Sequence, residues 1–413
     1  MSEQSISKEF LAAIPKTDLH VHLDGSLRIS TLIELAKEYN VELPSYTEEG
    51  LRELVFKDRY NNLGEYLKGF QYTVGVLQSE VALERCAYEL AIDNQIEGVR
   101  YIEVRFAPQL HVHRHLSAMT VLRAVDRGFA KAKSEFNQRA SVKEGREPEF
   151  HYGIICSALR MFKRGFSEYY TNLLESLTHM PPRDVYSLGS LDLARAAVSA
   201  RDDQGLPVVG FDLAGEEAGY PAEGHIEAFR YAKKHFLKKT VHAGEAYGPE
   251  SIFQAVTDLY ADRIGHGTYL LEPEAIQDMD IADRTTYVNR LGQYIADRRI
   301  TLEICLTSNL QTNPQMASIE EHTFRKMREQ RISTTLCTDN RLISNTTVTN
   351  EYSLAVDKLG LSPKDLKSVA VYGFKRSFFP GNYAEKRRYV RSVIDYYESL
   401  EESHLGGKSS TKV

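Results

Sequence analysis

Eight short β-rich runs alternate with longer helical patterns along this chain of 413 residues, and that alternation constrains the fold more than any other feature. Most runs are nearly continuous apolar stretches, as expected of parallel strands that helices cover. They lie near residues 17–22, 100–107, 151–158, 208–214, 239–243, 263–266, 301–306 and 333–338. Eight β–α units exceed what an open doubly wound sheet usually contains. The pattern therefore predicts an α/β fold closed into a (β/α)₈ TIM barrel.

The segments between the runs show helical periodicity. Thr31-Leu-Ile-Glu34 matches a capping box and predicts the start of a helix. Apolar residues at helical spacing over 83–91 and 121–129 predict two further helices. The stretch between the first two runs is unusually long, and we expect a lid at about residues 40–82 over the catalytic face. We expect one domain over residues 1–400 and a disordered tail over 401–413.

Charge and composition exclude several classes of protein. The net charge of −6 argues against a nucleic-acid partner, because such proteins are more often basic. The N-terminus lacks the pattern of a signal peptide, and no apolar run is long enough to cross a bilayer. The four cysteines form no CxxC pair, which favours buried free thiols. We expect a cytoplasmic protein that is a monomer or a weak homo-oligomer.

Four histidines and one aspartate lie at the ends of the predicted strands: His20, His22, His242, His266 and Asp339. His20 and His22 are two residues apart, so on a strand both side chains point to the same side. Zinc prefers imidazole and carboxylate ligands and keeps an open position in catalytic sites. Because barrel enzymes place their active sites at the carboxyl ends of the strands, this scatter predicts a zinc site at the barrel mouth.

Each of these residues also has a purely structural interpretation. His242 could be a core histidine bonded to a backbone carbonyl, and His266 could only cap a turn between two glycines. Asp339 could N-cap the helix that follows. Glu245 could be an acid whose pKa is raised by burial, or a carboxylate that only supports the local backbone. The local sequence leaves these alternatives open.

Other motifs carry less information. The run His111-Val-His-Arg-His115 could bind a metal, but it follows Pro108 in a polar segment, which favours a solvated loop. The chain has no G-x-S-x-G elbow, no Walker loop and no Pro-Cys-x-x-Cys segment of the cytidine-type zinc deaminases. Hydrolysis by an elbow-type serine nucleophile, Walker-type nucleotide binding and cytidine-type zinc deamination are therefore not indicated.

An ordered set of segments resembles the adenosine deaminase family of amidohydrolase-type metal-dependent barrels. The segments are 15–25 (PKTDLHVHLDG), 99–108 (VRYIEVRFAP), 211–216 (FDLAGE), 242–245 (HAGE), 263–267 (RIGHG) and 337–340 (CTDN). The resemblance spans residues 15 to about 355, and a set in this order is highly specific. It implies hydrolytic deamination of a purine nucleoside, adenosine and 2′-deoxyadenosine, to the inosine product and ammonia, with one Zn²⁺ per chain.

Carried over residue by residue, the resemblance implies which side chains bind the metal and which carry out the reaction. His20, His22, His242 and Asp339 would hold Zn²⁺, with a water in the open position. His266 would contact that water, and with Asp339 it would orient the water and help to take its proton. Glu245 would protonate N1 of the purine.

The resemblance also implies the contacts with the substrate. Gly215 would meet N3 through its backbone, Asp24 would bond a ribose hydroxyl, and Asn340 would meet N7. The apolar lid residues would be Leu63, Tyr66, Leu67 and Phe70.

Two positions depart from the animal members of the family. Asn340 replaces a second aspartate, and it can donate a hydrogen bond directly to N7. Tyr66 replaces a phenylalanine, and we expect its hydroxyl to reach solvent. Both changes leave the reaction class intact but could alter substrate preference.

Several alternatives stay open at this point. The segment 212–215 has no lysine to bridge two metals, so one metal is expected, with zinc and cobalt both possible. A carboxylate at Asp24 would repel a phosphate, which disfavours AMP. Aminodeoxyfutalosine or adenine could replace adenosine as the substrate. A non-catalytic purine-binding barrel is the remaining alternative.

Overall fold

The computed structural model describes residues 6–406 and contains one eight-stranded parallel sheet whose strands follow in chain order. The strands are β1 (Lys16–His22), β2 (Val99–Phe106), β3 (His151–Leu159), β4 (Val208–Ala214), β5 (Lys238–Ala243), β6 (Arg263–His266), β7 (Thr301–Ile304) and β8 (Thr334–Leu336). Each strand pairs in parallel with the next. Each also overlaps one predicted run, which confirms the eight predicted strands and the TIM barrel.

The barrel closes through hydrogen bonds between β1 and the residues just after β8. Val21 bridges Asp339 in parallel. The backbone N–H of His22 donates to the carbonyl of Asp339 at 2.7 Å, and the N–H of Asp339 donates to the carbonyl of His20 at 2.8 Å. The closure therefore fixes the backbone of three of the predicted metal ligands relative to one another.

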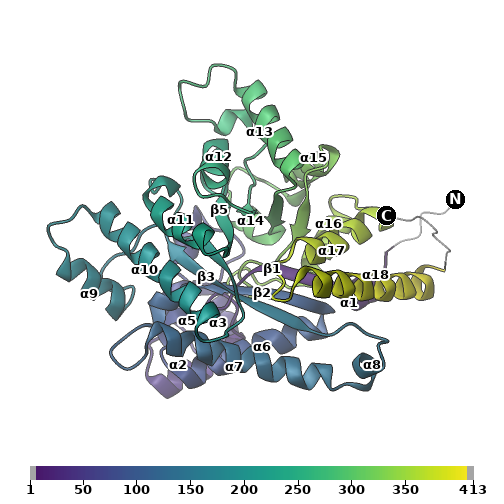
Figure 1. Cartoon of the computed structure of the whole chain (residues 1–413), viewed down its shortest axis with the longest axis horizontal. Coiled ribbons are helices and arrows are strands. Elements are labelled where there is room, and N and C mark those ends of the chain that lie inside the picture. Colours follow the sequence, from purple (N-terminus) through teal and green to yellow (C-terminus); the bar gives the residue numbers. More distant parts are fainter. Residues whose placement is uncertain (1–5, 407–413) are drawn as a thin grey trace.

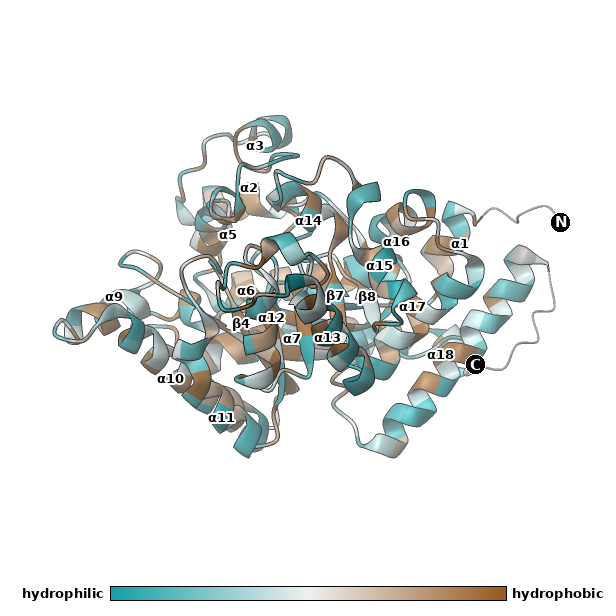
Figure 2. Cartoon of the chain, turned by 90° about the horizontal axis from the view of Figure 1, so that it is seen from above, coloured by the Kyte–Doolittle hydropathy of each residue, from teal (hydrophilic) through white to brown (hydrophobic). Residues whose placement is uncertain are grey.

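Helices surround the strands (Figure 1). They are α1 (Lys8–Ala13), α2 (Ile29–Tyr39), α6 (Glu80–Ile96), α7 (Ala118–Asn137), α8 (Ala140–Lys143), α9 (Glu168–Ser176), α10 (Pro182–Asp202), α11 (Ile226–Lys234), α12 (Pro249–Thr257), α13 (Arg284–Arg298), α14 (Leu306–Thr312), α15 (Phe324–Glu329), α16 (Val348–Asp357), α17 (Pro363–Arg376) and α18 (Tyr383–Leu405). Helices such as α13 and α18 carry hydrophilic residues along their length (Figure 2). The helices predicted over 83–91 and 121–129 are confirmed as parts of α6 and α7, whose apolar residues there are buried.

Two local predictions are wrong. Helix α2 begins at Ile29 rather than at Thr31, and Thr31 lies inside the helix. Its side chain is buried against α6 and donates to Glu89 Oε2 at 2.6 Å, so it does not cap the helix. At the other end, α18 continues to Leu405, so residues 401–405 are helical rather than a disordered tail. The remainder of the expected tail, residues 407–413, lies outside the described residues.

A separate helical segment joins β1 to β2 and contains α3 (Glu48–Leu54), α4 (Leu63–Leu67) and α5 (Phe70–Val76). It contacts helix α14, which follows β7, and the loop beyond β8. Arg52 Nη1 donates to the carbonyl of Leu342 at 2.9 Å, and the N–H of Tyr60 donates to the carbonyl of Gln311 at 3.1 Å. The segment therefore lies at the carboxyl end of the barrel.

Charged side chains fill part of the barrel interior. We call Glu103, Arg105, Asp212, Arg263 and Glu303 the inner set; all five are buried. Arg263 donates to Glu103 and, at 2.6 Å, to Glu303. Arg105 donates to Glu303 at 2.8 Å and lies 3.5 Å from Asp212. Because an unpaired buried charge is very costly, these contacts are what make a charged interior possible.

Residues 6–406 also bear on the predictions about the cysteines and about membrane-spanning segments. Within this range, the four cysteines are free and buried, as expected. No helix within the same range combines the length and the apolar character that a membrane crossing requires.

Candidate metal centre and active site

Three histidines and an aspartate converge at the carboxyl end of the barrel. Ligand atoms of His20, His22, His242 and Asp339 all lie within 4.8 Å of one another. The Nε2 atoms of His22 and His242 are 3.1 Å apart. Asp339 Oδ1 lies 3.4 Å from His20 Nε2 and 3.5 Å from His22 Nε2. The structure thus brings together the four residues that the sequence suggested as metal ligands.

The other ring nitrogens of two of these histidines face carboxylates of the inner set. His20 Nδ1 lies 2.9 Å from Glu303 Oε2, and His242 Nδ1 lies 3.1 Å from Asp212 Oδ1. A carboxylate only accepts, so each Nδ1 carries the proton and each Nε2 turns a lone pair toward the centre. His20 Nε2 is buried without a hydrogen-bond partner. A divalent cation bound by imidazole nitrogens and a carboxylate fits this arrangement.

Two residues at the site adopt a backbone conformation that is uncommon outside glycine. His266 has a φ of 64° and Asp339 a φ of 61°. Such left-handed residues persist only where surrounding contacts enforce them, and they concentrate at functional sites. Next to His266, a Cβ on Gly265 would come within 2.9 Å of His20 Cε1, so the packing around the cluster leaves no room for a side chain there.

Glu245 forms a second group with His266 and Asp339, with ligand atoms within 4.8 Å. Its Oε2 lies 3.5 Å from His266 Nε2. Burial raises the pKa of Glu245 well above its ordinary value, and the negative charges of Asp339 and Glu217 raise it further. A carboxyl group whose pKa is raised in this way can hold a proton and donate it.

Glu217 was not identified from the sequence, although it holds the loop that carries Glu245. Its carboxylate accepts hydrogen bonds from the backbone N–H groups of residues 244–247, at 2.6 to 3.0 Å, and from Ser251 Oγ. This contact fixes the loop that follows β5. The available signal was its place two residues beyond Gly215 at the end of β4, but nothing in the sequence says that Glu217 rather than Glu216 is buried.

The predicted substrate-binding residues lie around the same mouth. Asp24 is buried, its Oδ1 has no hydrogen-bond partner, and burial raises its pKa to about 7. Gly215 has a φ of 94°, a left-handed conformation that glycine adopts without strain because it has no Cβ. A Cβ on Gly25 would overlap the amide of Asn340, so the glycine is required for Asn340 to occupy its position.

The expectation for Tyr66 is wrong. Its side chain is 1% exposed, and its hydroxyl turns away from solvent toward the end of β8. The oxygen lies 2.7 Å from Ser344 Oγ and accepts a hydrogen bond from Asn340 Nδ2 at 2.9 Å. Polar partners at the end of β8 hold the hydroxyl because a buried phenol needs a hydrogen bond. The two departures from the animal pattern, Tyr66 and Asn340, are therefore in direct contact.

The other predicted lid residues are apolar and at least partly buried. Leu63 is buried, and Leu67 and Phe70 pack at the edge of the core. The ring of Phe70 lies 6.4 Å from that of His22, nearly perpendicular to it. Helix α4 and the start of α5 therefore lie beside the cluster of candidate metal ligands.

The interpretation of the 111–115 segment as a solvated loop is partly wrong. His111 is fully buried, and its Nδ1 bonds the carbonyl of Leu77 at 2.9 Å. His113 contacts the carbonyl of Gln78 at 3.2 Å. The two histidines attach this segment to the junction between α5 and α6, and they do not join a candidate metal group among the described residues.

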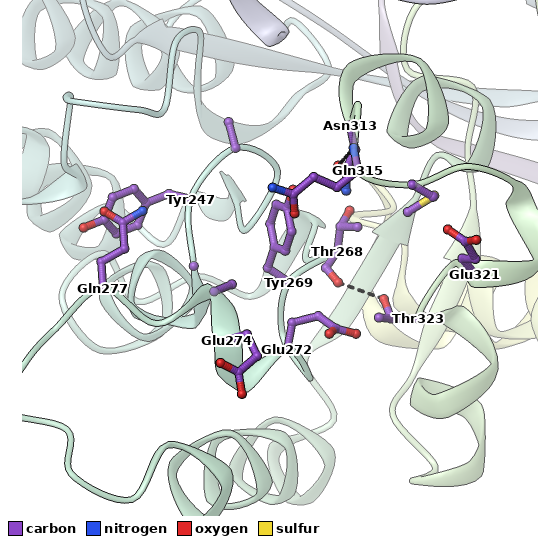
Figure 3. A pocket seen from close by; sticks show the side chains of 14 residues that line it. Tyr247, Thr268, Tyr269, Glu272, Glu274, Gln277, Asn313, Gln315, Glu321 and Thr323 are labelled. Atoms are coloured by element: carbon purple, nitrogen blue, oxygen red, sulfur yellow. Dashed lines mark hydrogen bonds between the residues drawn. The ribbon is translucent and has the colours of Figure 1, made fainter. Parts of the chain in front are cut away.

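A cavity of about 450 Å³ begins one residue beyond Glu245 and two residues beyond His266 (Figure 3). Thr323 Oγ1 bonds the carbonyl of Thr268 at one side of it, at 2.8 Å. Among the described residues that line the cavity there are carboxylates but no lysine or arginine; the acidic residues are Glu272, Glu274 and Glu321. The cavity wall is therefore unfavourable for a phosphate.

Comparison with known sequences gives one family. The sequence model of the adenosine deaminase family matches residues 15–397. The adenosine deaminase of Mycolicibacterium vanbaalenii is 36% identical over 383 residues, which cover 92% of this chain and 94% of that protein. The match therefore spans both proteins almost completely.

Solved structures share the fold. The Arabidopsis protein ADAL, determined in complex with IMP, superposes with a TM-score of 0.72 at 26% identity, covering 96% of this chain and 99% of ADAL. An amidohydrolase from Burkholderia ambifaria, determined with bound Zn, gives a TM-score of 0.75 at 19% identity, covering 98% of this chain and 97% of that one. The second likeness concerns the fold alone.

Proposed function

The chain belongs to the adenosine deaminase family, and from this premise we propose that it hydrolyses adenosine and 2′-deoxyadenosine to the corresponding inosine and ammonia. It is then a hydrolase that acts on the C–N bond of a cyclic amidine. The observation that carries the proposal is the convergence at one point of a metal-ligand group, His266 and Glu245, whose pKa is raised by burial.

The proposed metal is Zn²⁺, one per chain, held by His20, His22, His242 and Asp339. Three imidazole nitrogens and one carboxylate suit zinc, and the carboxylates behind His20 and His242 orient the rings as zinc sites require. When bound, the ion supplies a water of lowered pKa and stabilises negative charge at that water. Cobalt(II) would suit the same ligands.

Glu245 acts on the purine ring. Because burial raises its pKa, Glu245 can hold a proton and transfer it to N1. Protonation at N1 withdraws electrons from C6 and makes that carbon electrophilic. The backbone at Gly215 would meet N3, the amide of Asn340 would meet N7, and Asp24 would bond a ribose hydroxyl. These contacts would place C6 toward the histidine cluster.

His266 and Asp339 act on the water. Asp339 is held ionised despite its burial, because His20, His266 and His22 lower its pKa well below the ordinary value. It can therefore accept a proton as water adds to C6. The amino group then takes up the proton that Asp339 accepted. The C6–N bond breaks and ammonia leaves as the C6 hydroxyl becomes a carbonyl and returns its proton to Glu245. His266, which lies between Glu245 and Asp339, orients the water.

We also propose that helices α3 to α5 form a lid within a single barrel domain of residues 1–400. Leu63, Tyr66, Leu67 and Phe70 would exclude bulk water from the bound purine, which strengthens the electrostatic contacts inside the site. The hydrogen bonds from Arg52 to the loop beyond β8 and from Tyr60 to helix α14 support this placement.

The surroundings favour a nucleoside over a nucleotide. The acidic cavity beside Glu245 offers no cation for a phosphate, and Asp24 is a carboxyl group near the proposed ribose site. ADAL has a similar fold but was determined in complex with the nucleotide IMP. We therefore expect this chain to differ from ADAL in not favouring a nucleotide. Adenine and aminodeoxyfutalosine remain the alternative substrates, because neither requires a phosphate contact.

The test is a comparison of five substrates. Ammonia release would be measured from adenosine, 2′-deoxyadenosine, adenine, AMP and aminodeoxyfutalosine, each with and without a chelator. We expect adenosine and 2′-deoxyadenosine to have the highest kcat/KM and the chelator to abolish turnover. Bound metal without turnover of any of the five would contradict the proposal and would favour a purine-binding barrel.

A further inference from the structure

A chain of hydrogen bonds leads from the backbone to His266. The N–H of Phe324 donates to His322 Nδ1 at 3.0 Å. His322 Nε2 lies 3.1 Å from Asn309 Oδ1, and Asn309 Nδ2 lies 3.0 Å from His266 Nδ1. The three side chains are at most 2% exposed. No part of this chain was evident in the sequence, because Asn309 on α14 and His322 are far from His266 along the chain.

The directions of these hydrogen bonds follow from the first donor. A backbone N–H can only donate, so His322 Nδ1 accepts. Burial lowers the pKa of His322 to about 4, which keeps the ring neutral, and its single proton is then on Nε2. His322 therefore donates to Asn309 Oδ1. That contact fixes which end of the amide faces His266, and the amide nitrogen donates to His266 Nδ1.

We propose that Asn309 and His322 are positioning residues that hold His266 in the tautomer with its proton on Nε2. A ring whose Nδ1 accepts a hydrogen bond carries its proton on the other nitrogen. His266 would then present a hydrogen-bond donor, not a lone pair, to the reaction centre. Its Nε2 is buried without a protein partner and lies 3.5 Å from Glu245 Oε2.

The same logic separates the histidines at the mouth by function. His20 and His242 have carboxylate acceptors at Nδ1, so their Nε2 atoms are free to bind a cation. His266 has an amide donor at Nδ1, so its Nε2 cannot bind a cation without losing the proton. For these three histidines, the partner at Nδ1 thus decides which is a ligand and which is a donor.

The inference rests on the proposed function for its chemical consequence. A donating Nε2–H would hold the oxygen of the attacking water and direct another lone pair at C6. It could not take the proton of that water, and Asp339 would be the acceptor. The assignment of the tautomer itself does not depend on the identity of the substrate.

The direct test is nitrogen NMR of the histidine rings. Metal-loaded protein labelled with ¹⁵N-histidine would be compared with the His266→Gln variant, which identifies the His266 signals by their disappearance. We expect a protonated Nε2 and an unprotonated Nδ1. A protonated Nδ1 in the unmodified protein would overturn the inference.

Two substitutions of Asn309 distinguish a residue that sets the tautomer of His266 from one that only stabilises the fold. Asn309→Asp keeps the shape but places an acceptor at His266 Nδ1, so that nitrogen should gain a proton. Asn309→Ala removes the contact without imposing a tautomer. We expect kcat to fall roughly 10²-fold to 10⁴-fold in Asn309→Asp and only about tenfold in Asn309→Ala, with KM little changed in either.

A purely structural role predicts the opposite order, because alanine removes more contacts than aspartate. Equal or greater loss in Asn309→Ala, or ring signals of His266 that do not change in Asn309→Asp, would refute the inference. His111→Gln is the matched control for His322→Gln, since His111 is an equally buried histidine outside this chain of hydrogen bonds. Only His322→Gln should change the His266 signals, and equal changes in both variants would count against the assignment.

These results can be told apart from a failure of the proposed function. If the protein does not deaminate adenosine but His266 shows the Nε2 proton, the function is wrong and the assignment stands. If adenosine is deaminated and His266 carries its proton on Nδ1, the assignment alone is wrong.

Discussion

The polar residues of the barrel fall into two regions that differ in how well they are paired. In the inner set, every charged side chain forms an ion pair within the set, as Arg263 does with Glu303, although Arg105 Nε and Nη1 form no hydrogen bond. At the mouth, by contrast, the Nε2 atoms of His20 and His266 and Asp24 Oδ1 are buried without a partner. The residues of the proposed metal centre and its acid are called the mouth set: His20, His22, His242, Glu245, His266 and Asp339.

The difference shows where the molecule reserves space for something other than protein. Buried polar atoms normally find partners, so a cluster of unpartnered ones marks a position for a ligand. The two sets are joined at two contacts, Glu303 with His20 and Asp212 with His242. Through these two contacts the inner set orients the histidine rings of the mouth set. Substitutions in the two sets would show whether the inner set orients the mouth set.

The largest effect is expected where the mouth set loses a ligand. His242→Ala should reduce the metal content well below one per chain and lower kcat/KM by at least roughly 10³-fold, since metal-ion catalysis supplies several kcal/mol. The measurement is elemental analysis after dialysis, followed by the adenosine assay. His235→Ala, outside both sets, is the control and should bind metal normally. Unchanged metal content in His242→Ala would remove this residue from the ligand group.

A mouth residue that does not bind the metal should affect only the reaction. Glu245→Gln keeps the size of the side chain but cannot transfer a proton, so we expect one metal per chain and a kcat roughly 10²-fold to 10⁴-fold lower. Metal analysis and steady-state kinetics on the same preparation would separate the two properties. Turnover close to that of the unmodified protein would exclude Glu245 as the acid for N1.

The inner set should affect both metal affinity and stability. Glu303→Gln weakens the acceptor for His20 and leaves two buried arginines with less charge to pair with. We expect metal affinity to fall roughly 10-fold to 100-fold, and the free energy of unfolding to fall by a few kcal/mol. Metal competition titrations and thermal melting measure the two effects. A loss of stability at unchanged metal affinity would show that the inner set does not orient the mouth set.

The smallest effect is expected at the lid contact. Tyr66→Phe removes the hydroxyl that accepts from Asn340, so we expect the KM for adenosine to rise roughly twofold to tenfold, the range of one hydrogen bond. Tyr60→Phe is the matched control, because its hydroxyl contacts only the backbone of residues 55 and 57. Equal changes in both variants would mean that the lid is destabilised generally and that Asn340 is not involved.

Much of the fold was predictable because parallel strands covered by helices are continuous apolar runs. The sequence located all eight strands, and it placed the histidines and Asp339 at their carboxyl ends, where the barrel geometry brings them together. The capping box was wrong because Thr31 has a better partner in Glu89 across the helix interface. Local patterns cannot show such a long-range contact.

The supporting residues of the site were not predictable for the same reason. Glu217, Asn309 and His322 act through partners that are distant in sequence, and each has an ordinary surface-loop interpretation when read locally. The direction of the Tyr66 hydroxyl also depends on Ser344, which is 278 residues further along the chain. The sequence therefore indicates which groups meet at the mouth, but not the hydrogen bonds that orient them.

The central claim is that one metal ion, held by His20, His22, His242 and Asp339, makes this barrel a deaminase. Its most direct test is the titration of chelator-treated protein with Zn²⁺ while the ultraviolet change of adenosine to inosine is followed. We expect no turnover in the metal-free protein, and a rate that rises linearly and levels off at one equivalent of Zn²⁺. Full activity without metal, or a break at two equivalents, would contradict the account.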